Sequence, residues 1–255
     1  MERIDDILGY KDLKIFQDSS FFSFSLDSII LANYSTIRDR DKKIVDFCTG
    51  NGVIPIILSR RCNKIIDGVE IQKKLYDLAC KSIHINNLNG RVNIFNGDIK
   101  DFSKNNLNVY DLVLCNPPYF KNIENSTKNL SKEKMIARHE VCIDLNEVCH
   151  SASLVLKDNG TFSMIHRTER LIEVIFCMKN NNIEPKRIMF VHEKKYLPST
   201  MFLIEGQKNG RSGLKIDKPY ILYNDDNSMT EEYKRIQEEV NLWYKKVMMI
   251  LQVYI

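Results

Sequence analysis

The chain has 255 residues, of which 44% are hydrophobic and 27% charged, so it can bury a substantial core and has the composition of a globular protein. Its net charge of +4 permits contact with nucleic acid without requiring it. Met1–Asp6 is charged and unlike a signal peptide, and no apolar run reaches the roughly 18 residues needed to cross a bilayer.

The cysteines and histidines further limit the kind of protein that this sequence can encode. The seven cysteines form no Cys-x-x-Cys pair, and the five histidines are scattered along the chain. This pattern favours reduced thiols and argues against a metal site. We therefore expect a cytoplasmic protein that needs no metal and does not span a membrane.

Short apolar segments alternate with amphipathic ones, which predicts a doubly wound α/β sheet in a single domain. A short helix is expected over Leu26–Tyr34, ahead of the first strand. Ile188–His192 and Met201–Glu205 are expected to form a terminal antiparallel pair. The other expected strands are Lys43–Phe47, Ile65–Glu70, Val92–Phe95, Asp111–Cys115 and Thr161–Ile165, and the other expected helices are Val53–Arg60, Gln72–Asn87, Leu145–Leu156 and Leu171–Lys179, with a turn at Asp158–Gly160.

The C-terminal part of the chain contains one helix signal and one apolar stretch. Ser228–Glu231 has the pattern of a capping box, which predicts a helix from there to about Val240. Trp243–Ile255 is strongly apolar but too short to cross a bilayer, so a helix docked on the domain is the better interpretation.

A glycine-containing turn, Asp46–Gly52, follows the first predicted strand and opens the next helix. Glu70 ends the second strand twenty positions after Gly50. Glycines let the backbone approach a ligand and a carboxylate at that distance accepts hydrogen bonds from ribose, so the pair predicts a nucleoside cofactor. Pro55 replaces the third glycine of the dinucleotide fingerprint and lacks the N–H group that a pyrophosphate would need. A cofactor without phosphates, S-adenosylmethionine, is therefore favoured.

Asp98 follows the third predicted strand, where its carboxylate could accept a hydrogen bond from the adenine amine of such a cofactor. The alternative role is a helix cap before Ile99.

Asn116–Tyr119, an Asn-Pro-Pro-Tyr motif, follows the fourth predicted strand, at the end where open α/β sheets bind their ligands. Asn116 offers a side-chain oxygen, and the two prolines make a stiff loop with exposed carbonyl groups. Tyr119 offers an aromatic face for stacking. Two acceptors beside a ring suit an amino group on a flat base or on an amide, and a plain proline turn is the alternative.

With these features the chain resembles class I S-adenosylmethionine-dependent methyltransferases with an Asn-Pro-Pro-Tyr motif. It is most similar to the bacterial family that methylates the N6 amine of adenine 37 in valine tRNA. The resemblance extends from about Leu13 to Val240. It rests on Phe22–Ala32, Asp46–Pro55, Asn116–Phe120, Arg138–Glu140 and Gly213–Lys215.

The resemblance implies a single Rossmann-like domain whose seven-stranded, mostly parallel sheet ends in an antiparallel hairpin and carries helices on both faces. It implies a segment over residues 1–35 that covers the site, a methyltransferase domain over 36–240, and an extension over 241–255 whose role stays open. Cys48 stands where the general pattern has its first glycine, so the turn is expected to form without a positive φ at this residue.

The resemblance also implies the roles of individual residues, with S-adenosylmethionine as cofactor, the anticodon loop of tRNA as partner and an oligomeric state left open. The cofactor would contact Asp46, Cys48, Thr49, Gly50, Gly52, Glu70, Asp98 and Asn116. The catalytic residues would be Asn116, Pro117 and Tyr119, and the substrate would contact Tyr119, Phe120, Lys121, Arg138 and His139.

Four other functions fit parts of the pattern. A protein-glutamine N5-methyltransferase uses the same acceptor pair but usually carries a helical domain before the cofactor turn. Another methyltransferase of this motif could act on rRNA or DNA, although a DNA enzyme would need a separate recognition domain. A nucleic-acid-binding protein without turnover would not need the intact Asn-Pro-Pro-Tyr motif, and Pro55 argues against a dinucleotide oxidoreductase.

Overall fold

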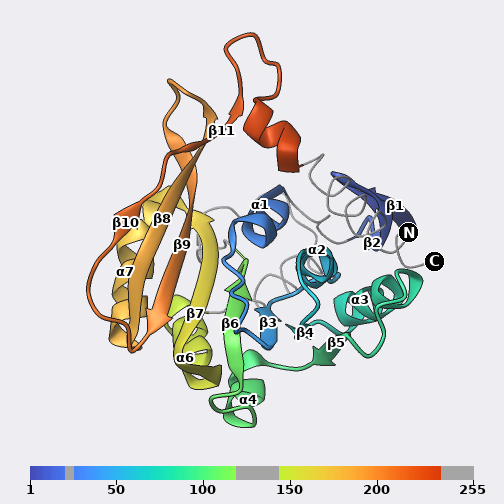
Figure 1. The fold of residues 1–255 in the computed structure, drawn as a ribbon. Coiled ribbons are helices and arrows are strands. Elements are labelled where there is room, and N and C mark those ends of the chain that lie inside the picture. The colour runs from blue at the N-terminus through green and yellow to red at the C-terminus, as the bar shows by residue number, and fades with distance from the viewer. Residues whose placement is uncertain (21–25, 119–143, 237–255) are drawn as a thin grey trace, which may run out of the picture.

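The computed structural model describes residues 1–20, 26–118 and 144–236 (Figure 1). A mixed β-sheet forms its centre, with strands in the order β10, β8, β9, β7, β6, β3, β4, β5, and β11 paired with β8. Strand β9 runs against β7 and β8, and the other pairs are parallel. The strands are β3 Lys43–Phe47, β4 Ile65–Glu70, β5 Val92–Asn96, β6 Tyr110–Cys115, β7 Leu156–Arg167, β8 Ile183–Lys194, β9 Ser199–Lys208, β10 Lys215–Ile216 and β11 Tyr220–Tyr223.

The seven strands from β5 to β8 confirm the expected sheet with its reversed final hairpin, and β10 and β11 extend it along β8. Consecutive residues of β3 enter opposite cores, since Ile44 packs in one apolar cluster and Val45 in the other. Burial on both faces explains why the central strands are mostly apolar on both sides.

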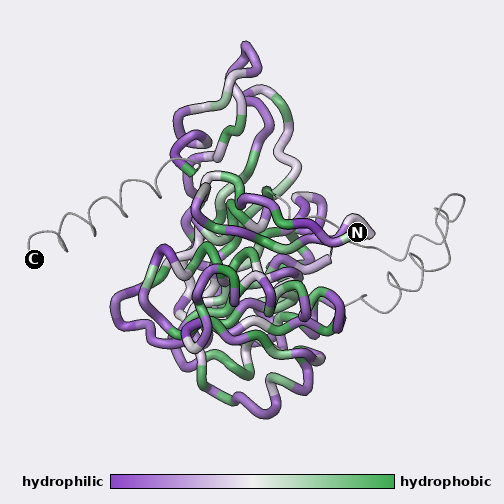
Figure 2. Tube along the Cα trace, turned by 90° about the vertical axis from the view of Figure 1, so that its right-hand side faces the viewer, coloured by the Kyte–Doolittle hydropathy of each residue, from purple (hydrophilic) through white to green (hydrophobic). Residues whose placement is uncertain are grey.

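Helices cover both faces of the sheet (Figure 1). One face carries α1 Leu26–Tyr34, α2 Val53–Arg61 and α3 Lys73–Ile85. The other carries α4 Ile99–Lys104, α6 Leu145–Val155 and α7 Leu171–Asn180, the last preceded by the 3₁₀ turn η1 Thr168–Arg170. Figure 2 shows that hydrophobic segments gather inside these layers while hydrophilic segments form the outer turns.

A hairpin of β1 Glu2–Ile7 and β2 Tyr10–Asp18, which the sequence analysis does not predict, lies outside α3 (Figure 1). Its turn contains Gly9 with a φ of 84°, a conformation that glycine adopts without strain. Leu13 and Ile15 are buried in the same apolar core as α1 and α2. The hairpin therefore packs against the helices on this face of the sheet.

Strands β7, β8 and β9 extend well beyond their predicted bounds, and helix α3 is shorter than predicted. Two local features also differ from the prediction. Asp158–Gly160, expected as a turn, lies within β7, where the register against β6 shifts and Asn159 takes a φ of 61°. Helix 231–236 starts after Thr230, whose Oγ1 accepts from the Tyr233 N–H at 3.2 Å. Ser228 instead donates to Asp226, so the expected capping box is wrong. Val240 and the apolar extension lie outside the described residues.

Candidate active site at the carboxyl ends of the strands

The carboxyl ends of β3, β4, β5 and β6 meet at one edge of the sheet. Strand order reverses between β3 and β6, where the chain passes from β3 to β4 on one side and β6 lies on the other. Open α/β sheets bind their ligands at such a switch point. Phe47 of β3 pairs with Cys115 of β6, so the glycine turn and the Asn-Pro-Pro motif start side by side.

The glycine turn is held by backbone hydrogen bonds to β4. Thr49 N–H donates to the Val69 carbonyl at 3.0 Å, and Gly50 N–H donates to Glu70 Oε2 at 2.8 Å. Gly52 has a φ of 86°, and a Cβ added there would lie 3.3 Å from the Ala79 Cβ of α3. At Gly50, with a φ of 58°, an added Cβ would meet nothing within 4 Å, so this peptide faces open space.

Cys48 has a φ of 58°, so the expectation of a turn without positive φ at this residue is wrong. A left-handed residue with a side chain costs about 1–2 kcal/mol. The bond from Thr49 to β4 and the bond from Gly50 to Glu70 fix the peptides that follow, and they hold Cys48 in this conformation. The chain therefore makes the usual tight turn without the usual glycine.

Asp46 is a fully buried carboxyl group at the base of the turn. Thr49 Oγ1 donates to its Oδ2 at 2.6 Å, while its Oδ1 has no hydrogen-bond partner among the residues that the structure describes. Burial raises the pKa of Asp46 to about 8, opposed by the Thr49 hydrogen bond and reinforced by the charge of Glu70. A buried acceptor of this kind suits a cationic ligand group.

Glu70 ends β4 and is almost fully buried. Its two oxygens accept from Gly50 N–H at 2.8 Å and from Gln72 N–H at 2.9 Å. Burial raises its pKa, and the backbone hydrogen bonds oppose that shift. Each carboxylate oxygen has a second lone pair, so these bonds leave acceptor capacity for a further donor.

Asp98 caps α4, since its Oδ1 accepts from Lys100 N–H at 2.8 Å. Its Oδ2 lies 3.4 Å from Lys100 Nζ. The cap is therefore present, and contact with a cofactor remains a prediction.

Asn116 leaves β6 and meets α1 on the other side of the site. Its Nδ2 donates to Ser28 Oγ at 2.9 Å. Pro117 is buried and Pro118 is half-buried. The fixed φ angles of the two prolines make the loop rigid at the point where it leaves the sheet. The other predicted site residues, Tyr119, Phe120, Lys121, Arg138 and His139, lie outside the described residues.

Three residues near the site were missing from the prediction. Ser28 reaches Asn116 from a helix far away in sequence. Asn51, inside the turn, donates from Nδ2 to the Phe16 carbonyl of β2 at 3.2 Å. Gly68 has no room for a side chain, because an added Cβ would lie 3.0 Å from Thr49 Oγ1. Ser28 and Asn51 lie in segments that carry the resemblance, Phe22–Ala32 and Asp46–Pro55, but neither residue was assigned a role from the sequence.

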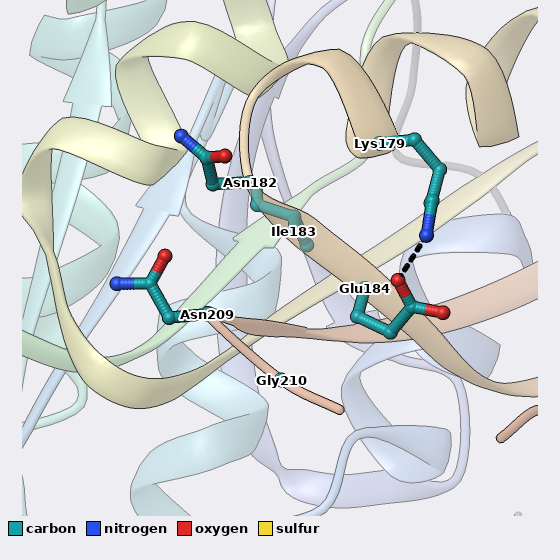
Figure 3. A pocket seen from close by; sticks show the side chains of 6 residues that line it. All are labelled: Lys179, Asn182, Ile183, Glu184, Asn209 and Gly210. Atoms are coloured by element: carbon teal, nitrogen blue, oxygen red, sulfur yellow. Dashed lines mark hydrogen bonds and ion pairs between the residues drawn. The ribbon is translucent and has the colours of Figure 1, made fainter. Parts of the chain in front are cut away.

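A separate hollow of about 340 Å³ lies at the opposite edge of the sheet (Figure 3). Ile183 begins β8 there, and β9, which runs the other way, ends beside it. Its lining residues are Lys179, Asn182, Ile183, Glu184, Asn209 and Gly210. Its only ion pair joins Lys179 to Glu184, and it shares no residue with the strand ends described above.

In the described ranges, no group of His, Cys, Asp and Glu could hold a metal ion. None of the helices described is long and apolar enough to cross a membrane.

The strand order, the reversed hairpin and the glycine turn at the switch point define a Rossmann-like methyltransferase. The model of the methyltransferase small domain family matches residues 27–179, and the chain belongs to that family.

Curated relatives and solved structures agree with this class. A Flavobacterium johnsoniae protein named tRNA1(Val) (adenine(37)-N6)-methyltransferase is 22% identical over 234 residues, 91% of this chain and 98% of the relative. A Trichodesmium erythraeum protein of the same name is 27% identical over 206 residues, 74% of this chain and 84% of the relative. A predicted O-methyltransferase from Agrobacterium tumefaciens shares the fold, with a TM-score of 0.67, 16% identity and coverage of 83% of this chain and 95% of that one. TYW2 of M. jannaschii in complex with AdoMet also shares the fold, with a TM-score of 0.53 and 19% identity. The match covers 81% of this chain and 84% of that one.

Proposed function

We propose that this protein transfers a methyl group from S-adenosylmethionine to the exocyclic N6 amine of an adenine in tRNA, namely adenine 37 of valine tRNA. The observation that carries the proposal is Asn116, which leaves β6 directly beside the glycine turn. The choice of adenine in valine tRNA as the substrate is based on the names of the relatives. A cytoplasmic location follows from that substrate.

The described residues fit the proposed cofactor. The open side of Gly50 leaves room for a ligand against the backbone, and Glu70 keeps acceptor capacity for ribose hydroxyls. The unpartnered Oδ1 of Asp46 would accept from the ammonium of the methionine part, which would favour the charged carboxylate. Asp98 would meet the adenine end. When bound, S-adenosylmethionine supplies a methyl group on a sulfonium, which a nitrogen lone pair can attack.

The amine of adenine is a weak nucleophile because its lone pair is delocalised into the ring. Asn116 Oδ1 and the Pro117 carbonyl would accept hydrogen bonds from its two N–H groups and favour a more tetrahedral nitrogen. The new N–C bond forms as the S–C bond breaks, and one amine proton leaves to solvent. Alignment for in-line transfer supplies several kcal/mol of the barrier reduction, and fixed dipoles supply more.

Substrate contacts would come from the segment after the motif. Tyr119 and Phe120 would stack on the adenine once it leaves the anticodon loop. Lys121, Arg138 and His139 would contact the RNA. The segment 1–35 would cover the site, which the Ser28–Asn116 bond supports.

Asn116→Ala should lower methylation of tRNA by about 100-fold or more, the effect typical for losing one preorganised hydrogen-bonding group. Its affinity for S-adenosylmethionine, measured by calorimetry, should stay close to that of the wild type. Asn89→Ala, on the surface of the chain, is the matched control.

Nucleoside mass spectrometry of tRNA from cells with and without the gene tests the substrate. Loss of N6-methyladenosine from valine tRNA would support the proposal. An unchanged tRNA together with loss of a methylated glutamine in a protein would establish the alternative substrate, and unchanged turnover by Asn116→Ala would refute the role of Asn116.

A further inference from the structure

Helix α1 brings a hydroxyl group to the proposed catalytic amide. Ser28 Oγ lies 2.9 Å from Asn116 Nδ2, across 88 residues of sequence. Ser28 is only 8% exposed, so water competes little for this bond. In this bond Nδ2 donates to Ser28 Oγ, which places Oδ1 on the other branch of the amide.

The far end of α1 is anchored to the sheet and to α2. Ser35 Oγ lies 2.8 Å from Ser163 Oγ of β7, and Thr36 N–H donates to Glu205 of β9 at 2.6 Å. The Arg187 guanidinium of β8 lies 4.0 Å over the Tyr34 ring. Arg61 of α2 donates to the Ser35 carbonyl at 2.9 Å. These contacts fix the helix, and so they fix the position of Ser28.

We infer that Ser28 is a positioning residue that orients the Asn116 amide for methyl transfer. This inference rests on the proposed function. The amine presents N–H groups, so the amide must turn its oxygen toward it; a reversed amide would set N–H against N–H. By accepting from Nδ2, Ser28 favours the productive orientation before the substrate arrives, which removes a reorganisation step from the reaction.

Ser28→Ala removes the acceptor and leaves a good helix former in α1, so the helix should persist. We expect kcat for tRNA methylation to fall about 10- to 100-fold, as for an unsatisfied hydrogen-bonding group, with the Kd of S-adenosylmethionine within about twofold. Ser59→Ala is the matched control, because Ser59 is a buried serine of α2 whose hydroxyl donates within its own helix, to the Ile56 carbonyl at 2.6 Å. An equal kcat in the wild type and Ser28→Ala would overturn the inference.

A second measurement does not depend on activity. The side-chain NH₂ resonances of Asn116, assigned by their loss in Asn116→Ala, should shift and exchange faster with water in Ser28→Ala but not in Ser59→Ala. Unchanged resonances would overturn the role of Ser28. If the wild type methylates no tRNA, the proposed function fails, while these resonances still decide whether Ser28 holds the amide.

Discussion

Two neighbouring carboxyl groups, those of Asp46 and Glu70, are buried beneath the glycine turn with raised pKa values. For Asp46 the ordinary value of 3.8 applies to the unfolded chain, and the folded value is about 8. Between these values the folded protein holds a proton that the unfolded chain has lost. Stability from this group is therefore complete below the unfolded pKa and is lost as the pH rises through the folded pKa.

We predict that Asp46 makes the free energy of unfolding fall as the pH rises from about 4 to about 8, and that Asp46→Asn loses this contribution because its side chain cannot ionise. His166 acts in the opposite direction below pH 6.5, because burial lowers its pKa to about 4, so the quantity to compare is the difference in slope between the variant and the wild type. Glu70 shifts in the same direction as Asp46 and would retain part of the slope. Urea denaturation at several pH values across this range measures the effect. Asp12→Asn, which alters a surface carboxylate paired with Arg60, is the control. The same slope in Asp46→Asn and the wild type would contradict the prediction.

At the level of elements, the β1–β2 hairpin depends on α3. Asn86, which caps the end of α3, accepts from Lys14 N–H at 2.9 Å and donates to the Lys14 carbonyl at 2.6 Å. Ser82 Oγ accepts from Phe16 N–H at 2.9 Å. Side chains of a helix thus complete the hydrogen bonding of a strand that has a partner on one side only.

Asn86→Ala should lower the free energy of unfolding by about 1–3 kcal/mol, because two polar groups of Lys14 lose their partner. Hydrogen–deuterium exchange should rise in residues 10–18 and stay unchanged in β3 and β6. Asn89→Ala provides the control, since Asn89 contacts His84 at the surface. Unchanged exchange in β2 would show that the apolar contacts alone hold the hairpin.

The elements that the sequence predicts well are those whose signal is local. Strands β3 and β4 match their predicted bounds, because burial on both faces produces a short, mostly apolar segment that ends at the polar residues of the site. The hairpin was missed because Arg3, Asp5 and Asp6 interrupt its alternation and its partner α3 lies some 70 residues away. The segment 1–35 was expected to cover the site, but the pairing of Ser28 with Asn116 could not be predicted, since only the assembled sheet brings α1 to the end of β6.

On the scale of the whole molecule, the charges are largely balanced within the described residues. Lysines there commonly pair with carboxylates, as Lys73 does with Asp77 and Lys104 with Asp101. Residues 119–143, which follow the motif, contain five basic residues against three acidic ones in the sequence. Five basic against three acidic residues give this segment a net charge of +2 directly after the motif, which favours contact with RNA phosphates.

We predict that the Kd of tRNA rises by about tenfold or more between roughly 50 and 200 mM salt, because phosphate contacts release counterions. Filter binding or fluorescence anisotropy measures this, and the affinity for S-adenosylmethionine serves as the internal control. Replacing Lys121 and Arg138 together with alanine should make the salt dependence shallower. A tRNA affinity independent of salt would rule out a phosphate-dominated interface.

The anchoring of α1 affects the order in which the chain folds during its synthesis. Thr36 bonds to Glu205 across 169 residues of sequence, and β9, which carries Glu205, lies between β7 and β8. A nascent chain that has emerged only as far as Asn116 already contains the whole glycine turn but lacks the strand that fixes α1. Such long-range contacts form late because loop closure must come first. The contact that anchors α1 can therefore form only after β9 has emerged from the ribosome, and a chain that stops before β9 holds the Asn-Pro-Pro motif without that anchor.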